Sequence, residues 1–235
     1  MMTQTANPTT LARRAGWLYL LLVPLGVYAL LYIPELIWVP GNPAQTVSRL
    51  GQHESAFRWS ILAAFAIQIT QLFVALALYD LFKAVNKRMA VLMVLFTLAA
   101  MPIAMFNELF HVAALYLGAG QLASTETAQQ VALLFQLHAD GIMIAHVFWG
   151  FWLFPMGYLS AKSGFVPRPI GWLLMLASLA YVMDSILWFG APDLSVGFAE
   201  YIGWAEIFLP LWLVTRGVKN HPVAMGTPSR ELSRA

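Results

Sequence analysis

The chain contains no cysteine and has few charged side chains for its length. Because none of its 235 residues is cysteine, disulfides, thiolate metal ligands, cysteine nucleophiles and covalent c-type haem attachment are excluded. Only 10% of the residues are charged, whereas a soluble domain carries about 25%. Phosphate-loop, dinucleotide-binding and serine-hydrolase motifs are also missing. The sequence therefore does not describe a soluble globular domain, a disordered chain or a nucleic-acid-binding protein.

Apolar residues make up 60% of the sequence and are concentrated in long runs. A helix needs about 20 mostly apolar residues to cross a bilayer. Six such runs occur, at about 16–39, 59–81, 90–117, 131–160, 170–189 and 198–215. The sequence predicts an all-α, multi-pass transmembrane bundle of six spanning helices within residues 12–219, with disordered tails at 1–11 and 220–235. The first run is longer than the apolar part of a signal peptide, so we expect it to be retained.

The basic residues between these runs predict the orientation. The connections on one side of the membrane contain two basic residues, Arg49 and Arg58. The other side has Arg13, Arg14, Lys83, Lys87, Arg88, Lys162, Arg168, Arg216, Lys219, Arg230 and Arg234. Lysine and arginine favour the cytoplasmic side of a membrane. We therefore expect both termini in the cytoplasm, which an even number of spans also requires, and a location in the bacterial cytoplasmic membrane.

Two connections between the spans contain local signals. The segment 40–58, which includes glycine and proline, is predicted to contain a short helix on the outer surface. Ser124 and Glu126 precede the fourth run and are placed to cap that helix.

Polar side chains inside the apolar runs are the candidate functional residues. An ionisable group in the bilayer core is costly, so such groups usually face the interior of a bundle. They are Glu35, Asn107, Glu108, His111, His138, Asp140, His146, Asp184 and Glu206. Counting residues from the ends of the spans brings most of them to a similar depth, in the outer half of the membrane. We expect a polar pocket there, with Asn107, Glu108, His111, Asp140 and His146 as candidate pocket residues.

Helical spacing refines this expectation. Glu108 and His111 are three residues apart and share one face of a helix. Asp140 points nearly opposite His138. Both can be buried only if their helix has protein on two sides; otherwise Asp140 must lie high enough to reach water.

Several chemistries are compatible with these residues. Glu108, His111 and His138 could bind a metal ion, since a Glu-x-x-His pair on one helix is used by metal sites in helical bundles. His111 and His138 could bind a haem iron. Asp184 and Glu206 as acids, with His138 as base, could form the catalytic site of an isomerase or cyclase acting on a polyprenyl-like substrate.

Two further interpretations of the polar residues involve neither catalysis nor a metal ion. The polar groups could only hold the helices together, as in a packing or assembly subunit. Trp149 and Trp152 are interpreted as core residues.

The leading hypothesis is a pocket for a lipophilic small molecule, with membrane lipid as the other partner, no nucleic acid, and any cofactor left open.

Several short stretches resemble the bacterial membrane family named domain of unknown function 4386. They are Ala12-Arg13-Arg14-Ala15-Gly16-Trp17-Leu18-Tyr19, Leu76-Ala77-Leu78-Tyr79, Val85-Asn86-Lys87, Leu137-His138-Ala139-Asp140-Gly141, Gly157-Tyr158-Leu159, Ser163-Gly164, Pro167-Arg168 and Asp184-Ser185. The resemblance covers roughly residues 12–219 and implies a membrane protein of six or seven helices, with no established activity. It implies polar residues at His138, Asp184 and Glu206. Glu108, His111 and His146 depart from the family pattern, which would fit an activity acquired by this chain.

Overall fold

The computed structural model describes residues 8–118 and 124–218, and these residues form helices without any strand. The long helices are α1 (Pro8–Gly26), α4 (Glu54–Phe82), α5 (Lys87–Gly118), α6 (Thr125–Lys162) and α7 (Arg168–Gly190). The shorter elements are the π-helix η1 (Val27–Tyr32), α2 (Ile33–Ile37), α3 (Pro43–Gln52), the 3-10 turn η2 (Pro192–Leu194), α8 (Phe198–Ile202), the 3-10 turn η3 (Gly203–Ile207) and α9 (Phe208–Thr215).

Five helical segments of the described residues are long and apolar enough to cross a membrane. They are Pro8–Ile37, which combines α1, η1 and α2, and the four helices α4, α5, α6 and α7. Each coincides with one of the first five predicted spans, which confirms an all-helical, membrane-embedded protein. The sixth predicted span is divided into α8, η3 and α9. The count of six therefore stays a prediction.

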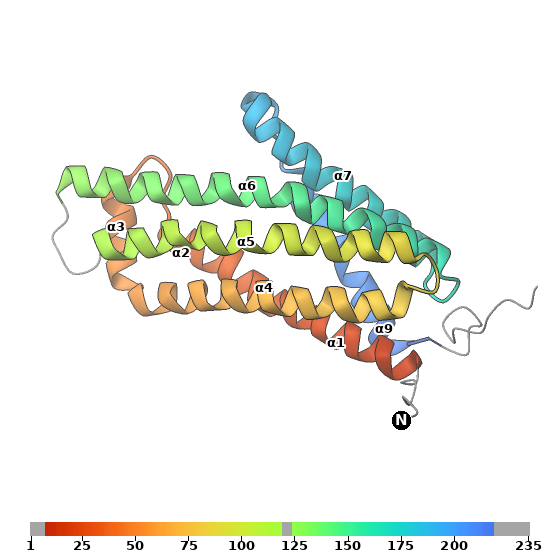
Figure 1. The fold of residues 1–235 in the computed structure, drawn as a ribbon. Helices are drawn as coiled ribbons and strands as arrows, with labels where there is room; N and C mark the ends of the chain where they lie inside the picture. Colours follow the sequence, from red (N-terminus) through yellow and green to blue (C-terminus); the bar gives the residue numbers. More distant parts are fainter. Residues whose placement is uncertain (1–7, 119–123, 219–235) are drawn as a thin grey trace, which may run out of the picture.

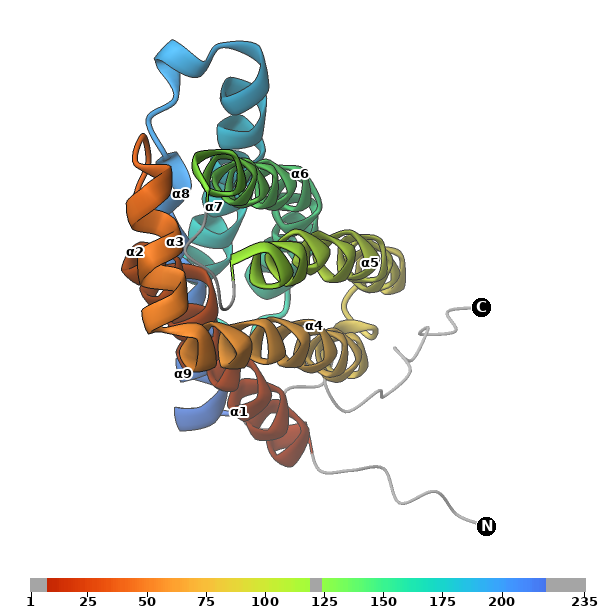
Figure 2. The same cartoon turned by 90° about the vertical axis from the view of Figure 1, so that its left-hand side faces the viewer.

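The long helices form a bundle in which neighbours in sequence are mostly neighbours in space (Figure 1). In the end-on view, α4, α5 and α6 lie side by side, and α3 crosses one end of the bundle (Figure 2). α1 packs against both α4 and α9, and α7 packs along α6 before the two diverge. This arrangement places α6 between α5 and α7.

The two ends of the described chain meet at one end of the bundle. The hydroxyl of Thr9 donates a hydrogen bond to the backbone oxygen of Val218 over 2.6 Å. The α4–α5 and α6–α7 connections lie at this same end (Figure 1). The basic residues between 13 and 216 on the predicted cytoplasmic side are therefore collected at one end of the molecule, whereas α3 lies at the other.

The predicted local signals are present in the structure. Helix α3 occupies the middle of the segment 40–58, and the side chain of Asn42 caps it by accepting a hydrogen bond from Gln45 N. The Ser124 hydroxyl accepts a hydrogen bond from Thr127 N at 3.2 Å and so begins α6. Helix α1 starts at Pro8, within the predicted N-terminal tail. The rest of that tail and the tail 220–235 lie outside the described residues.

Helices α6 and α7 approach closely because small residues face each other. A Cβ atom added to Gly157 would lie 2.6 Å from the backbone oxygen of Gly171. The Ser178 hydroxyl of α7 donates to Gly150 O of α6 at 2.7 Å, and Ser185 donates to Met143 O at 2.8 Å. Small residues and interhelical hydrogen bonds of this kind hold membrane helices together.

Candidate functional site

The first polar group in the bundle is a buried cluster formed by Glu108, His111 and His138. In α5, Nδ1 of His111 lies 3.1 Å from Oε2 of Glu108, as their spacing predicts. From α6, Nε2 of His138 lies 3.0 Å from Oε1 of the same carboxylate. The three side chains are at most 8% exposed. The metal candidates chosen from the sequence are therefore brought together in one place.

The neighbours of this cluster hold its two helices in close register. The Asn107 amide donates to the backbone oxygen of His138 at 2.9 Å. Gly141 faces Asn107 without a side chain between them. The rings of Phe57 and Phe135 contact the His111 imidazole, with centroid distances of 4.8 and 5.4 Å. The cluster is thus enclosed by apolar rings.

The cluster matches a small metal centre better than a haem site. One potential ligand atom from each of Glu108, His111 and His138 lies within 4.8 Å of the others. The two imidazoles are stacked, with ring centroids 3.4 Å apart and planes at 19°. Two axial haem ligands must instead point at each other from opposite faces of a porphyrin. This stacking does not provide that geometry.

Asp140 and His146 lie on α6 but take no part in the cluster. Oδ1 of Asp140 accepts hydrogen bonds from Gln136 and from the Trp188 indole of α7, both at 3.0 Å. Asp140 therefore faces α7 while His138 faces α5, so their helix has protein on two sides, although Asp140 is only half-buried. The His146 ring packs against Trp149 and Tyr181.

Asp184 caps the short helix α8. Its two carboxylate oxygens accept hydrogen bonds from the backbone nitrogens of Phe198 and Ala199, at 2.7 and 2.6 Å. An acidic side chain at a helix N-terminus satisfies amide groups that otherwise lack partners. Asp184 thereby fixes the depth at which the segment 198–215 begins.

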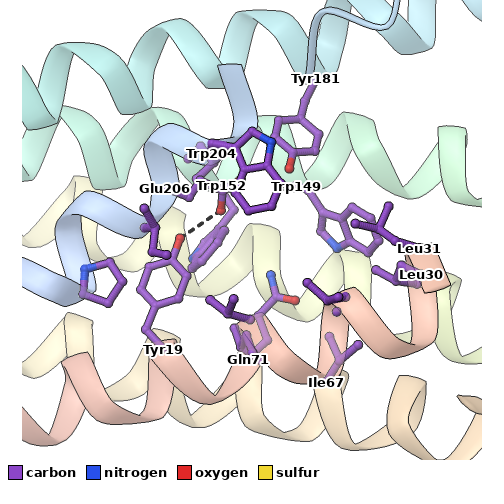
Figure 3. Close-up of a pocket in the computed structure, with 17 residues that line it drawn as sticks. Tyr19, Leu30, Leu31, Ile67, Gln71, Trp149, Trp152, Tyr181, Trp204 and Glu206 are labelled. Atoms are coloured by element: carbon purple, nitrogen blue, oxygen red, sulfur yellow. Dashed lines mark hydrogen bonds between the residues drawn. The ribbon is translucent and has the colours of Figure 1, made fainter. Parts of the chain in front are cut away.

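Glu206 lies in η3 and belongs to a different site, a cavity of about 260 Å³ (Figure 3). Oε2 of Glu206 accepts a hydrogen bond from the Tyr19 hydroxyl of α1 at 2.9 Å. The lining residues with a polar side-chain atom come from five elements and are Tyr19, Gln71, Trp149, Trp152, Tyr181, Trp204 and Glu206. The other lining residues are mostly aliphatic, so these polar side chains are set in an otherwise apolar wall.

Two donors in the cavity lining have no partner. The Nε1 atoms of Trp149 and Trp152 are buried, and neither has a hydrogen-bond partner among the described residues. The Trp152 ring also contacts Tyr19, with centroids 5.6 Å apart. Buried polar atoms are usually hydrogen-bonded, so these two indole donors are exceptions, and both belong to residues that line the cavity.

The mouth of the cavity is apolar. Val27 and Leu31 of the π-helix η1 and Trp204 of η3 line it and are 42%, 50% and 62% exposed. Val27 and Leu31 belong to a segment that is long and apolar enough to span a membrane, and their exposure places the mouth on the outer face of the bundle. π-Helical turns such as η1 are frequently found at functional sites.

The cluster and the cavity lie at different depths. His138 and Trp149 are 11 residues apart on the continuous helix α6, which corresponds to roughly 16 Å along its axis. The sequence placed Glu206 at the level of His138, and the structure differs. The physical reason is that α8 starts beside Asp184, six residues before the end of α7, rather than at the outer end of that helix.

The predicted site residues therefore form separate groups instead of one pocket. Of the residues chosen from the sequence, Glu206 lines the cavity, and the five predicted pocket residues do not. The three catalytic candidates have different partners: His138 binds Glu108, Asp184 binds the start of α8, and Glu206 binds Tyr19.

Sequence analysis also missed several cavity residues. Trp152 belongs to the buried hydrophobic core, as the sequence predicts, and both Trp149 and Trp152 also line the cavity. Tyr19 and Gln71 were not considered, although a buried glutamine in an apolar helix is a detectable signal. Gln71 is only 6% exposed, and its amide faces the cavity (Figure 3).

Comparison with known proteins identifies the family. The family described as domain of unknown function DUF4386 matches residues 14–217. The chain therefore belongs to this family, as the sequence motifs predicted. An uncharacterized protein from Archaeoglobus fulgidus is 29% identical over 172 residues, which cover 72% of this chain and 90% of the relative. No solved structure matches the chain.

Proposed function

We propose that this protein binds a lipophilic small molecule that carries a hydroxyl or carbonyl oxygen, in the cavity beside Glu206. The observation that carries the proposal is the pair of unpartnered indole donors, Trp149 Nε1 and Trp152 Nε1, in the lining of an otherwise mostly apolar cavity. An oxygen acceptor on the ligand would satisfy either donor once its indole ring turns toward the cavity, because both Nε1 atoms are buried. A ligand hydroxyl can in turn donate to the Glu206 carboxylate.

The size and lining of the cavity support a small apolar ligand. Its volume of about 260 Å³ is close to the lower end of the range of small-molecule sites, which begins near 300 Å³. Such sites combine apolar walls with a few polar groups that orient the ligand. Tyr19, Gln71 and Tyr181 supply further polar groups on the lining.

Access from the bilayer supports a lipophilic ligand rather than a water-soluble one. The exposed mouth residues Val27, Leu31 and Trp204 belong to segments that we place in the membrane. A molecule dissolved in the lipid can therefore reach the cavity without passing through water.

The proposal includes a location and orientation. We propose a multi-pass protein of a bacterial cytoplasmic membrane with six spans and both termini in the cytoplasm. The hydrogen bond between Thr9 and Val218 and the shared end of the basic residues support this topology. In that orientation, α3 lies on the outer surface.

The test is native mass spectrometry of the protein purified in mild detergent, followed by extraction and identification of bound lipophilic molecules. The blocking variant is Gly26→Leu, because Gly26 lines the cavity and an added Cβ would meet no atom within 4 Å. The matched control is Gly51→Leu on α3, where an added Cβ also meets nothing. We expect the wild type and the control to retain one ligand and the blocking variant to lose it.

The alternatives give different results. A packing or assembly subunit would show no bound molecule, and its thermal stability would not respond to lipophilic alcohols or ketones. An acid–base enzyme would retain ligand but lose turnover in Glu206→Gln. Equal ligand retention in Gly26→Leu and Gly51→Leu would contradict the proposed site.

A further inference from the structure

The cluster in the outer part of the bundle carries an inference that is independent of the cavity. We propose that Glu108, His111 and His138 together bind one divalent transition-metal ion, with Zn²⁺ as the reference ion. The cluster supplies two imidazole nitrogens and a carboxylate, which is a donor set used by zinc and by non-haem iron. The chain has no cysteine, so thiolate-dependent ions such as Cu(I) are disfavoured.

The separations between ligand atoms fit a single small ion. Nδ1 of His111 and Nε2 of His138 lie 3.1 and 3.0 Å from the Glu108 oxygens. Neighbouring ligands around a tetrahedral zinc ion with bonds of 2.0–2.1 Å are about 3.3 Å apart. The two carboxylate–imidazole separations therefore need to widen by only a few tenths of an ångström. The three ligand atoms lie within 4.8 Å of one another, so the widest pair must close by up to about 1.5 Å to surround one ion.

Charge also favours a cation at this position. Glu108 is buried in an apolar part of the bundle, and its ion-pair partners among the described residues are the two imidazoles. A buried carboxylate needs a compensating positive charge. The stacked rings, 3.4 Å apart, cannot both be cationic without strong repulsion. The compensating charge is thus either one proton or one metal ion.

The surroundings hold the ligands in position. Glu108 and His111 are fixed by their i, i+3 spacing on α5. The hydrogen bond from Asn107 to the His138 backbone oxygen sets the register of α6 against α5. Phe57 and Phe135 cover the His111 ring and exclude water. A preorganised site of this kind would tie the two helices together.

The experiment is a titration of the purified, chelator-treated protein with Co²⁺, followed by displacement with Zn²⁺. We expect one ion per chain, with the visible absorption of a nitrogen- and oxygen-coordinated Co²⁺. Affinity should fall as the pH is lowered, because the ring nitrogens that face Glu108 must give up protons to the solvent. Sub-stoichiometric uptake would overturn the proposal.

Variants identify the ligands. Glu108→Gln, His111→Gln and His138→Gln should each weaken Co²⁺ binding at least about tenfold, since even residues that only support a ligand cost 10- to 100-fold. The matched control is His146→Gln, a histidine of α6 that contacts Trp149 and Tyr181 instead of the cluster. Unchanged affinity in His138→Gln would overturn the proposal.

A measurement on the wild type covers the case in which a variant does not fold. X-ray absorption of the Zn²⁺-loaded protein should show nitrogen and oxygen ligands only, with outer-shell scattering from two imidazoles. A spectrum without imidazole scattering would mean that the ion is elsewhere, and the cluster would then be a hydrogen-bonded group that shares a proton. Because neither readout involves Glu206, the result is separate from that of the ligand-binding test.

Discussion

The side-chain oxygen of Asn107 occupies the space where Gly141 would carry a methyl group. A Cβ atom added to Gly141 would lie only 1.9 Å from Asn107 Oδ1. The same Asn107 side chain donates to the His138 backbone oxygen, three residues earlier on α6. The close approach of α5 and α6 beside the Glu108 cluster therefore depends on a glycine at 141.

Gly141→Ala should destabilise the protein. The added methyl group must push Asn107 away, which breaks its bond to His138 and overpacks the helix interface, at a cost of about 1–3 kcal/mol. Thermal denaturation in detergent measures the effect. Gly51→Ala is the control, since its Cβ has free space. If both variants melt like the wild type, the contact does not hold the two helices together.

Asp184→Ala should loosen the start of the sixth predicted segment. The variant removes both acceptors of the Phe198 and Ala199 amides, and a hydrogen bond to a charged group contributes about 1.5–3 kcal/mol. Hydrogen exchange of the peptide covering 198–207 should become faster. Asp193→Ala, which replaces an exposed acid nearby, should leave the exchange rate unchanged. Slow exchange in Asp184→Ala would show that the cap is dispensable.

The fold was predictable where the signal is local. Apolar runs predicted the third and fifth spans with ends within three residues, for example 90–117 against the observed Lys87–Gly118. The first, second and fourth helices start eight, five and six residues earlier than predicted, at Pro8, Glu54 and Thr125. The i, i+3 pair Glu108 and His111 was predictable for the same reason. His138 joins them because α5 and α6 are continuous helices that pack against each other. His138 lies 13 residues from the start of α6 and His111 seven from the end of α5, so the meeting depends on how the two helices are offset as well as on residue counts.

Glu206 could not be placed in this way because its segment is not continuous. The 3-10 turn η3 and the capped start of α8 change the depth of Glu206. Both features depend on contacts with α7, which the spacing of apolar residues in the sequence does not reveal. Tyr19 and Gln71 were missed for another reason. Both are neutral, and the candidate residues were chosen mainly by the cost of placing an ionisable group in the bilayer, although Tyr19 and Gln71 together line the cavity.

Trp149→Phe should separate ligand binding from packing. Phenylalanine keeps an aromatic ring but removes the unpaired Nε1 donor, whose burial costs free energy when no partner is present. We expect the melting temperature of the ligand-free protein to stay the same or rise, while ligand retention in native mass spectrometry falls. A lower melting temperature with full retention would indicate a packing role only.

The orientation can be tested in the same cysteine-free background. Ser48 on α3 and Ala84 in the α4–α5 connection are both exposed and lie at opposite ends of the bundle, so single cysteines can be introduced at either position. With both termini in the cytoplasm, a membrane-impermeant maleimide should label Ser48→Cys in intact cells, and Ala84→Cys only after the membrane is permeabilised. The unmodified chain, which has no thiol, is the background control. The reverse pattern would mean that the basic end faces outward, and labelling of both positions in intact cells would contradict a transmembrane arrangement.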